Sequence, residues 1–184
     1  MFTIRKEIPT DIDAREALLD TCFGQTRHTK TSERLREGRL PARNLALSAT
    51  AADRLIGTVR LWHISAGYKG GKLSCPALLL GPLAVSPEYQ SLGVGSALMH
   101  ASIEAATLLG HRAILLVGDA PYYARFGFST EKTNALYFPG PFARERFLAL
   151  ELVPRALEDV QGLVAATGQL TSMPNALSQL PQAA

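Results

Sequence analysis

The segment with the clearest chemical potential is Gln90-Ser91-Leu92-Gly93-Val94-Gly95-Ser96, which lies between a predicted buried strand and the start of an amphipathic helix. Its two glycines allow a bulky anion to approach the backbone closely at the helix entrance. The N–H groups of a first helical turn have no intrahelical partners, and the helix dipole is positive at that end, so they bind phosphate oxygens. Because no Lys or Arg lies between Lys72 and Arg112, backbone amides are the main groups available to hold the anion.

Two familiar phosphate-binding designs do not fit this spacing. A Walker loop ends in Lys followed by Ser or Thr, whereas Gly95 is followed by Ser and Ala. A dinucleotide-binding fingerprint has its first glycine close to the strand end and a third glycine three residues after the second. Here residues 86–92 intervene and Leu98 takes the third position, although Asp119 after the next strand would suit a ribose ligand. Both designs are therefore disfavoured.

A third design matches a longer stretch of the chain. The Gln-x-x-Gly-x-Gly pattern of residues 90–95 follows a strand interrupted by Pro82, and it precedes a helix, a strand and the sequence Tyr-Ala-Arg-Phe-Gly-Phe at residues 123–128. This arrangement resembles the GNAT superfamily of acyl-CoA-dependent N-acyltransferases. The segments Leu-Gly-Pro-Leu-Ala-Val (residues 80–85) and Gly-Asp-Ala-Pro-Tyr-Tyr-Ala-Arg-Phe-Gly-Phe (residues 118–128) look like one branch of predicted acetyltransferases within it. The likeness spans about residues 2–152.

The resemblance implies both a fold and a reaction. The fold is of the α/β (α+β) class: a mixed, mostly antiparallel central sheet with a splayed parallel strand pair and flanking helices. The parted strands form a V that takes acetyl-CoA as acyl-donor cosubstrate, and the enzyme is an acetyl-CoA-dependent N-acetyltransferase. The acetyl group passes directly to a primary amine in a ternary complex, while an N–H near Leu83 or Ala84 stabilises the oxyanion.

The resemblance also implies which residues hold the cofactor. Three of them would hydrogen-bond the pantetheine amides, namely Leu83, Ala84 and Val85. The others would hold the pyrophosphate through their N–H groups, namely Gln90, Ser91, Leu92, Gly93, Val94, Gly95 and Ser96.

Tyr123 is the candidate for the acid that protonates the departing thiolate, because of its place four residues before Gly127. A phenol with an ordinary pKa of about 10 keeps its proton at neutral pH. The alternative is that Tyr122 or Tyr123 only packs against Phe126 and Phe128, and the glycine motif favours the catalytic role. The alternative function is a non-catalytic module that binds CoA or acyl-CoA through the same fold, which would have little need for an acid here.

The general base is not assigned. Many GNAT members use a carboxylate on the bulged strand, but residues 77–85 contain none. His63, Asp119, Glu88 or a chain of water molecules would serve. However, His63 would equally be a hydrogen-bonded strand residue without a catalytic role. In the same way, Glu88 would be a solvated turn residue and Asp119 a helix cap.

Other reactive or charged residues receive less specific interpretations. Cys75 would suggest an acyl-enzyme route, but no His or basic residue adjoins it in sequence to lower its pKa, so direct transfer is preferred. Trp62 fits the core and the acceptor pocket equally well, and the loop of residues 23–30 would line that pocket. Four arginines could guide an acidic acceptor or the 3′-phosphate of CoA, but we interpret them as a solvated helix face, namely Arg34, Arg36, Arg39 and Arg43.

Hydrophobic periodicity predicts the elements that position these residues. Strands are expected at residues 2–8, 44–50, 55–64, 78–85, 113–117 and 147–153, and helices after Asp11, around residues 32–38, from Val94 to Gly110 and over residues 119–126. Residues 51–54 form a hairpin turn, and residues 66–72, with three glycines, form a loop. Pro82 has no N–H for the ladder, so it predicts a bulge where two neighbouring strands part.

Composition bounds the remaining possibilities. The 184 residues, 47% of them apolar, suit one acyltransferase domain at residues 1–153 followed by a C-terminal tail at residues 154–184, packed on the domain or partly disordered. The formal charge of +3 without a basic, aromatic-studded stripe argues against nucleic acid as a partner. No apolar run reaches a membrane span and residues 1–9 lack a signal sequence, so we expect a cytoplasmic protein without a membrane partner. No metal site is expected, and a homodimer is left open.

Overall fold

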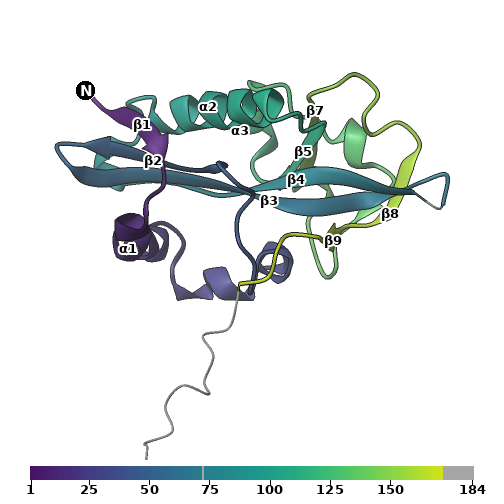
Figure 1. Ribbon diagram of the computed structural model, residues 1–184, viewed down its shortest axis with the longest axis horizontal. Coiled ribbons are helices and arrows are strands. Elements are labelled where there is room, and N and C mark those ends of the chain that lie inside the picture. The colour runs from purple at the N-terminus through teal and green to yellow at the C-terminus, as the bar shows by residue number, and fades with distance from the viewer. Residues whose placement is uncertain (72, 172–184) are drawn as a thin grey trace, which may run out of the picture.

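The computed structural model describes residues 1–71 and 73–171. One mixed sheet organises the chain, with the strand order β1-β2-β3-β4-β5-β7 (Figure 1). Its neighbouring strands are antiparallel except for β4 and β5, which confirms the predicted fold class. The elements are β1 (Thr3–Lys6), α1 (Ile12–Phe23), β2 (Ala46–Ala51), β3 (Arg54–Lys69), β4 (Leu73–Val85), α2 (Val94–Leu108), β5 (Ala113–Val117), α3 (Ala120–Ala124), β6 (Leu136–Tyr137), β7 (Phe147–Glu151), β8 (Val160–Leu163) and β9 (Ala165–Ala166).

The predicted bulge in β4 is present. The β3–β4 register shifts there, so that Gly81 and Pro82 together lie opposite Arg60. β4 and β5 run parallel, and their described pairing is confined to Leu78 and Leu79 of β4. Beyond this point the two strands separate, and the β4 edge from residue 80 to residue 85 has no β5 partner. The splayed parallel pair is therefore confirmed.

Helices cover both faces of the sheet. Figure 1 shows α2 along one face and α1 across the opposite face. The inner side of α2 packs into the main core through Val94, Leu98 and Met99, as its predicted periodicity requires. Leu18 and Leu19 of α1 pack beside Ala84 of β4. No helix in the described part of the chain is long and apolar enough to cross a membrane.

Two predicted boundaries are wrong. The loop expected at residues 66–72 is strand for much of its length, because β3 continues to Lys69 and exchanges hydrogen bonds with β4 and β8. Pairing on both edges outweighs the low strand propensity of Gly67, and the turn itself is made by Gly70 and Gly71, both with positive φ. The helix expected around residues 32–38 is a shorter 3-10 helix, η3 (Thr31–Leu35), since so short a segment cannot offset the cost of helix nucleation.

The sequence did not predict β8 and β9. Both strands pair with β3, which places part of the predicted tail in the sheet. Their glycine and alanines carry little strand propensity, so only the open β3 edge makes strands of them. The domain boundary at residue 153 stays a prediction, and the end of the tail, residues 172–184, lies outside the described residues.

Candidate active site

Residues 90–96 form an open loop before α2. Ser91 and Gly93 adopt left-handed backbone conformations, with φ of 64° and 80°, and the helix begins at Val94. The Ala97 N–H donates to the Gly93 carbonyl at 2.9 Å. The N–H groups of residues 94–96 precede this bond and belong to the unsatisfied first turn. These are the amides that the sequence analysis expects to hold phosphate.

A cavity of about 420 Å³, here called the loop cavity, lies beside this loop. Most of the expected cofactor-binding residues line it, namely Val85, Gln90, Ser91, Gly93, Val94, Gly95 and Ser96. Three of the expected residues do not, and of these Leu83 lines the neighbouring cavity described below. The other two line neither cavity: Leu92 is exposed to solvent, and the Ala84 side chain is buried beside α1. Any role for these two residues in binding must therefore come from their backbone.

The two glycines of the loop are required for different reasons. Gly93 has open space around it and a backbone conformation that side chains rarely adopt. Gly95 is crowded, since a Cβ there would lie 2.9 Å from the Tyr122 hydroxyl oxygen. Tyr122 in turn carries the Arg125 guanidinium 4.5 Å from its ring centroid. Tyr122 and Arg125 thus complete the wall of the loop cavity opposite the helix start.

Arg125 is a site residue that the sequence analysis missed. It lies outside the cation-free interval between Lys72 and Arg112, and it reaches the loop cavity from the end of α3. The signal was present in the Tyr-Ala-Arg-Phe-Gly-Phe segment. Backbone amides are therefore not the sole source of positive potential at this cavity.

A second cavity of about 660 Å³, here called the strand cleft, occupies the space between the splayed strands. One wall is the β4 bulge at residues 79–83, and a second wall is formed by residues 117–119 with Tyr122 and Tyr123. The third wall comes from residues between Phe23 and Arg36, which include part of the loop that the sequence analysis expected at an acceptor pocket. Gln90 and Tyr122 line both cavities, so the two cavities adjoin, and together they are here called the groove.

Tyr123 lines the strand cleft and is also firmly packed. Its ring lies 5.0 Å from the Tyr122 ring and 6.0 Å from the Phe128 ring, centroid to centroid. Gly118 lies directly beneath it, because a Cβ on residue 118 would be 2.1 Å from Tyr123 Cε2. Burial raises the pKa of the Tyr123 phenol to about 12. The hydroxyl is therefore protonated throughout the neutral range.

Comparisons with known proteins match this chain to one family. Residues 43–130 match the acetyltransferase (GNAT) domain. The uncharacterized N-acetyltransferase YhbS of Escherichia coli K12 is 30% identical over 164 residues, covering 88% of this chain and 93% of YhbS. The chain belongs to the GNAT acetyltransferase family.

Two solved GNAT structures resemble the whole fold. YhbS from Escherichia coli in complex with CoA has a TM-score of 0.75 and 29% identity, covering 90% of this chain and 89% of YhbS. A GNAT family acetyltransferase from Brucella melitensis in complex with acetyl-CoA has a TM-score of 0.63 and 26% identity, covering 91% and 96%.

The three candidate bases lie in different places in this GNAT fold. His63 lies beside His111, with ring centroids 5.4 Å apart and the rings tilted by 49°, and Glu88 is exposed, with its Oε2 3.9 Å from Nη2 of Arg54. Neither lines the groove. Asp119 does line the strand cleft, but it also caps α3, since its Oδ2 accepts the Tyr122 N–H at 3.2 Å.

Glu33 is a second carboxylate in the strand cleft that the sequence analysis did not consider. Its Oε2 lies 2.8 Å from Nη2 of Arg36. Sequence spacing gave no signal that Glu33 would line the cleft, because η3 reaches the cleft only through tertiary packing.

Arg36 corrects the interpretation of the arginine cluster. It does not belong to a solvated helix face, because its side chain is only 8% exposed and lines the strand cleft. Nη1 lies 3.7 Å from the position that a Cβ on Gly81 would occupy, so the guanidinium sits against the β4 bulge. Burial lowers the pKa of this guanidinium. Within the described structure its buried Nε has no hydrogen-bond partner.

Trp62 and Cys75 take structural positions. Trp62 is buried in the core, and its Nε1–H donates a hydrogen bond to the Gly81 carbonyl at 2.6 Å, which fixes the position of the bulge. Cys75 lies outside the groove and donates its Sγ–H to the Ala156 carbonyl at 3.6 Å. Burial raises the pKa of the Cys75 thiol. A neutral thiol away from the cleft gives no support to an acyl-enzyme route.

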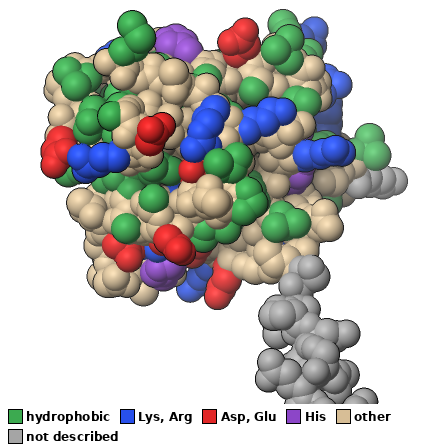
Figure 2. Space-filling view, turned by 60° about the vertical axis from the view of Figure 1, so that its left-hand side comes forward, with side chains coloured by type: hydrophobic (Ala, Val, Ile, Leu, Met, Phe, Trp, Pro, Cys, Tyr) green, Lys and Arg blue, Asp and Glu red, His purple; other side chains and the backbone are tan. Residues whose placement is uncertain are grey.

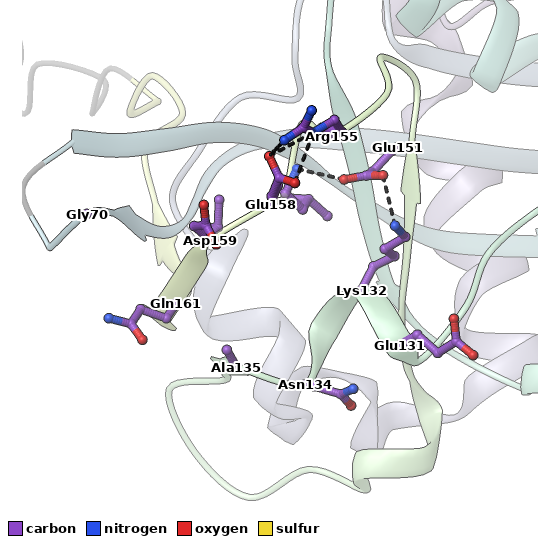
Figure 3. Close-up of a pocket in the computed structure, with 12 residues that line it drawn as sticks. Gly70, Glu131, Lys132, Asn134, Ala135, Glu151, Arg155, Glu158, Asp159 and Gln161 are labelled. Atoms are coloured by element: carbon purple, nitrogen blue, oxygen red, sulfur yellow. Dashed lines mark hydrogen bonds and ion pairs between the residues drawn. The ribbon is translucent and has the colours of Figure 1, made fainter.

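A separate cavity of about 530 Å³ lies near β8 and is shown in Figure 3. Its lining has four acids and two bases, and both bases are paired, Lys132 with Glu151 at 3.1 Å and Arg155 with Glu158 at 2.8 Å. The acids are therefore in excess, which does not suit an anionic coenzyme. On the face shown in Figure 2, positive and negative side chains are interspersed. The groove along β4 therefore remains the candidate active site.

Proposed function

We propose that this protein transfers an acetyl group from acetyl-CoA directly to a primary amine within a ternary complex. One observation carries the proposal: the loop cavity and the strand cleft form a groove that runs from the α2 N-terminus to the gap between β4 and β5. The crystallised relatives hold CoA and acetyl-CoA, which supports the same donor here. The cytoplasmic location and the homodimer stay predictions.

The groove accommodates the two ends of the coenzyme differently. The diphosphate would accept hydrogen bonds from first-turn N–H groups between Val94 and Ser96, with Arg125 adding positive charge at the same cavity. The pantetheine amides would pair with the backbone of residues 83–85, where β4 has lost its β5 partner. The thioester would then lie in the strand cleft beside Tyr123.

In the proposed reaction, the neutral amine attacks the thioester carbonyl carbon, and the C–S bond breaks as the amide forms. The N–H of Leu83 or Ala84 stabilises the oxyanion. After the attack, the nitrogen is positively charged, and it loses a proton to a carboxylate of the cleft, Glu33 or Asp119, directly or through water. The released CoA thiolate takes up a proton from Tyr123, and the proton gained by the carboxylate returns to the phenolate through solvent, so both groups regain their starting states.

The pKa of Tyr123 limits how that proton moves. A phenol with a pKa of about 12 is a weaker acid than a thiol with an ordinary pKa of about 8.5, so complete transfer to a solvated thiolate would cost about 5 kcal/mol. Desolvation in the cleft raises the thiol pKa as well, which narrows this gap. Tyr123 therefore acts as a hydrogen-bond donor to the departing sulfur, and the proton follows as negative charge develops.

The proposal is tested by thiol release from acetyl-CoA over a broad panel of primary amines. Acetyl-CoA should stabilise the folded protein by about 2.7 kcal/mol at a hundred times its dissociation constant. Tyr123→Phe should lower kcat by about 10²-fold or more and leave acetyl-CoA affinity nearly unchanged. Binding of acetyl-CoA without turnover of any amine would favour a non-catalytic binding module, and absence of a thermal shift would contradict acetyl-CoA as the donor.

A further inference from the structure

Resting on the proposed function, we infer that the acceptor is a small amine that also carries a carboxylate, and that Arg36 binds this carboxylate at the floor of the strand cleft. This substrate class follows from an arginine that the fold buries without satisfying, and from the charges that surround it.

The Arg36 guanidinium has donors left over. Its Nη2 is used by Glu33 at 2.8 Å and by the Ser32 hydroxyl at 3.4 Å. In the described structure, Nε is buried without an acceptor and Nη1 makes no hydrogen bond. A buried, unpaired donor of a charged group is costly. A carboxylate in the cleft would accept a charge-assisted hydrogen bond from Nη1 and so pair the buried guanidinium with an anion.

Arg36 lies where the acceptor must come. It packs against Gly81 in the β4 bulge, and the thioester would lie in the same cleft. Residues of the β4 bulge and Tyr123 line this cleft together with Arg36. A carboxylate held here would bring the rest of a small acceptor close to the reacting carbonyl.

Two further cations flank the same position. Lys30 and Arg146 line both the strand cleft and a neighbouring cavity of about 680 Å³. Arg27 is neutralised by Glu16 and Asp20, whereas no carboxylate of the described residues pairs with Lys30 or Arg146. The acids of the cleft are Glu33 and Asp119. The cleft thus keeps positive charge beyond what its own acids balance, which attracts an anionic substrate.

Glu33 explains why the anion should belong to an amine. Its Oε2 is held by Arg36, and its other oxygen remains to accept a proton from an ammonium group. An acid and a guanidinium side by side match a molecule whose amine and carboxylate are a few bonds apart. A simple alkylamine would satisfy Glu33 and leave Arg36 unpaired, so a free amino acid is the better fit.

The test compares L-amino acids with the L-amino alcohols of the same side chains, which retain the amine and lose the carboxylate. For the wild-type protein, kcat/KM should be higher for the amino acid than for its alcohol by about ten- to a hundredfold. Arg36→Gln should abolish most of this preference. Because removing Arg36 from a buried position risks misfolding, Arg146→Gln, at an exposed residue, provides a second variant and should raise KM for amino acids more than it lowers kcat.

Arg155→Gln is the matched control, since Arg155 is an exposed arginine at the distant cavity of Figure 3 and should leave the preference unchanged. Equal kcat/KM for acids and alcohols, or preference for the alcohols, would overturn the inference and leave the acetyltransferase proposal standing. So would acetylation of other amines only, with no amino acid accepted. Absence of both acetyl-CoA binding and thiol release would instead refute the proposed function, and the inference with it.

Discussion

Gly118→Ala offers a sharp test of Tyr123 that leaves the phenol itself in place. The new Cβ would lie 2.1 Å from Tyr123 Cε2 and 3.1 Å from Cζ, whereas carbon atoms in contact prefer about 3.5–4.0 Å. The ring must therefore move by roughly 1.5 Å. Gly118 directly follows β5, and neither Gly118 nor Tyr123 lines the loop cavity.

A misplacement of about 1 Å in a catalytic group can cost about 10²-fold in rate, so we expect Gly118→Ala to lower kcat by about that factor. Overpacking should lower the free energy of unfolding by about 1–3 kcal/mol, and calorimetric titration should show nearly unchanged acetyl-CoA affinity. Steady-state thiol release at saturating acetyl-CoA measures the effect on kcat. The double variant with Tyr123→Phe should be no slower than Tyr123→Phe alone, because both changes remove one contribution.

Gly168→Ala is the matched control, since a Cβ there meets its nearest neighbour at an ordinary 3.5 Å. The reasoning would be refuted if Gly118→Ala folded, bound acetyl-CoA and turned over at the wild-type rate. That result would mean that the position of Tyr123 against Gly118 has no bearing on the departing thiolate.

Three further predictions address the cofactor site, acid stability and the chemical route. Gly95→Val should weaken acetyl-CoA binding by about 1.4 kcal/mol or more, measured by titration calorimetry, because the side chain would collide with Tyr122; equal affinity would contradict this. Hydrogen bonds from Arg5 lower the pKa of the Asp11 carboxyl to about 2. Their contribution to the free energy of unfolding, about 2 kcal/mol, should be fully present above the pKa of an unfolded Asp, near 4, and should be lost as the pH falls toward 2. Acid denaturation of Asp11→Asn should therefore show a smaller loss of stability between pH 4 and pH 2. Cys75→Ala should retain full turnover, and a trapped acetyl-Cys75 would disprove direct transfer.

The parts of the site that the sequence predicted depend on local backbone rules. Gly93 and Gly110 delimit α2 because a helix needs special backbone conformations at its ends. Pro82 predicts the bulge because it removes a ladder donor. The separation of β4 from β5 follows from that bulge, so the groove was largely predictable.

The acceptor side of the cleft was not predictable in the same way. Glu33 lies in the short 3-10 helix η3 and Arg36 directly follows it, and the local sequence pattern gives no direction for either side chain. Packing against Gly81, a residue distant in sequence, turns Arg36 into the cleft and buries it. Arg125 was missed for a similar reason, since its place at the loop cavity depends on how α3 packs beside Gly95. Such contacts are set by tertiary structure alone.

The most direct test of the central claim is a crystal structure of this protein with CoA bound. We predict diphosphate oxygens within hydrogen-bonding distance of the N–H groups of residues 94–96, and the thiol in the strand cleft near Tyr123. A diphosphate bound elsewhere on the molecule, with the first turn of α2 unoccupied, would contradict the account.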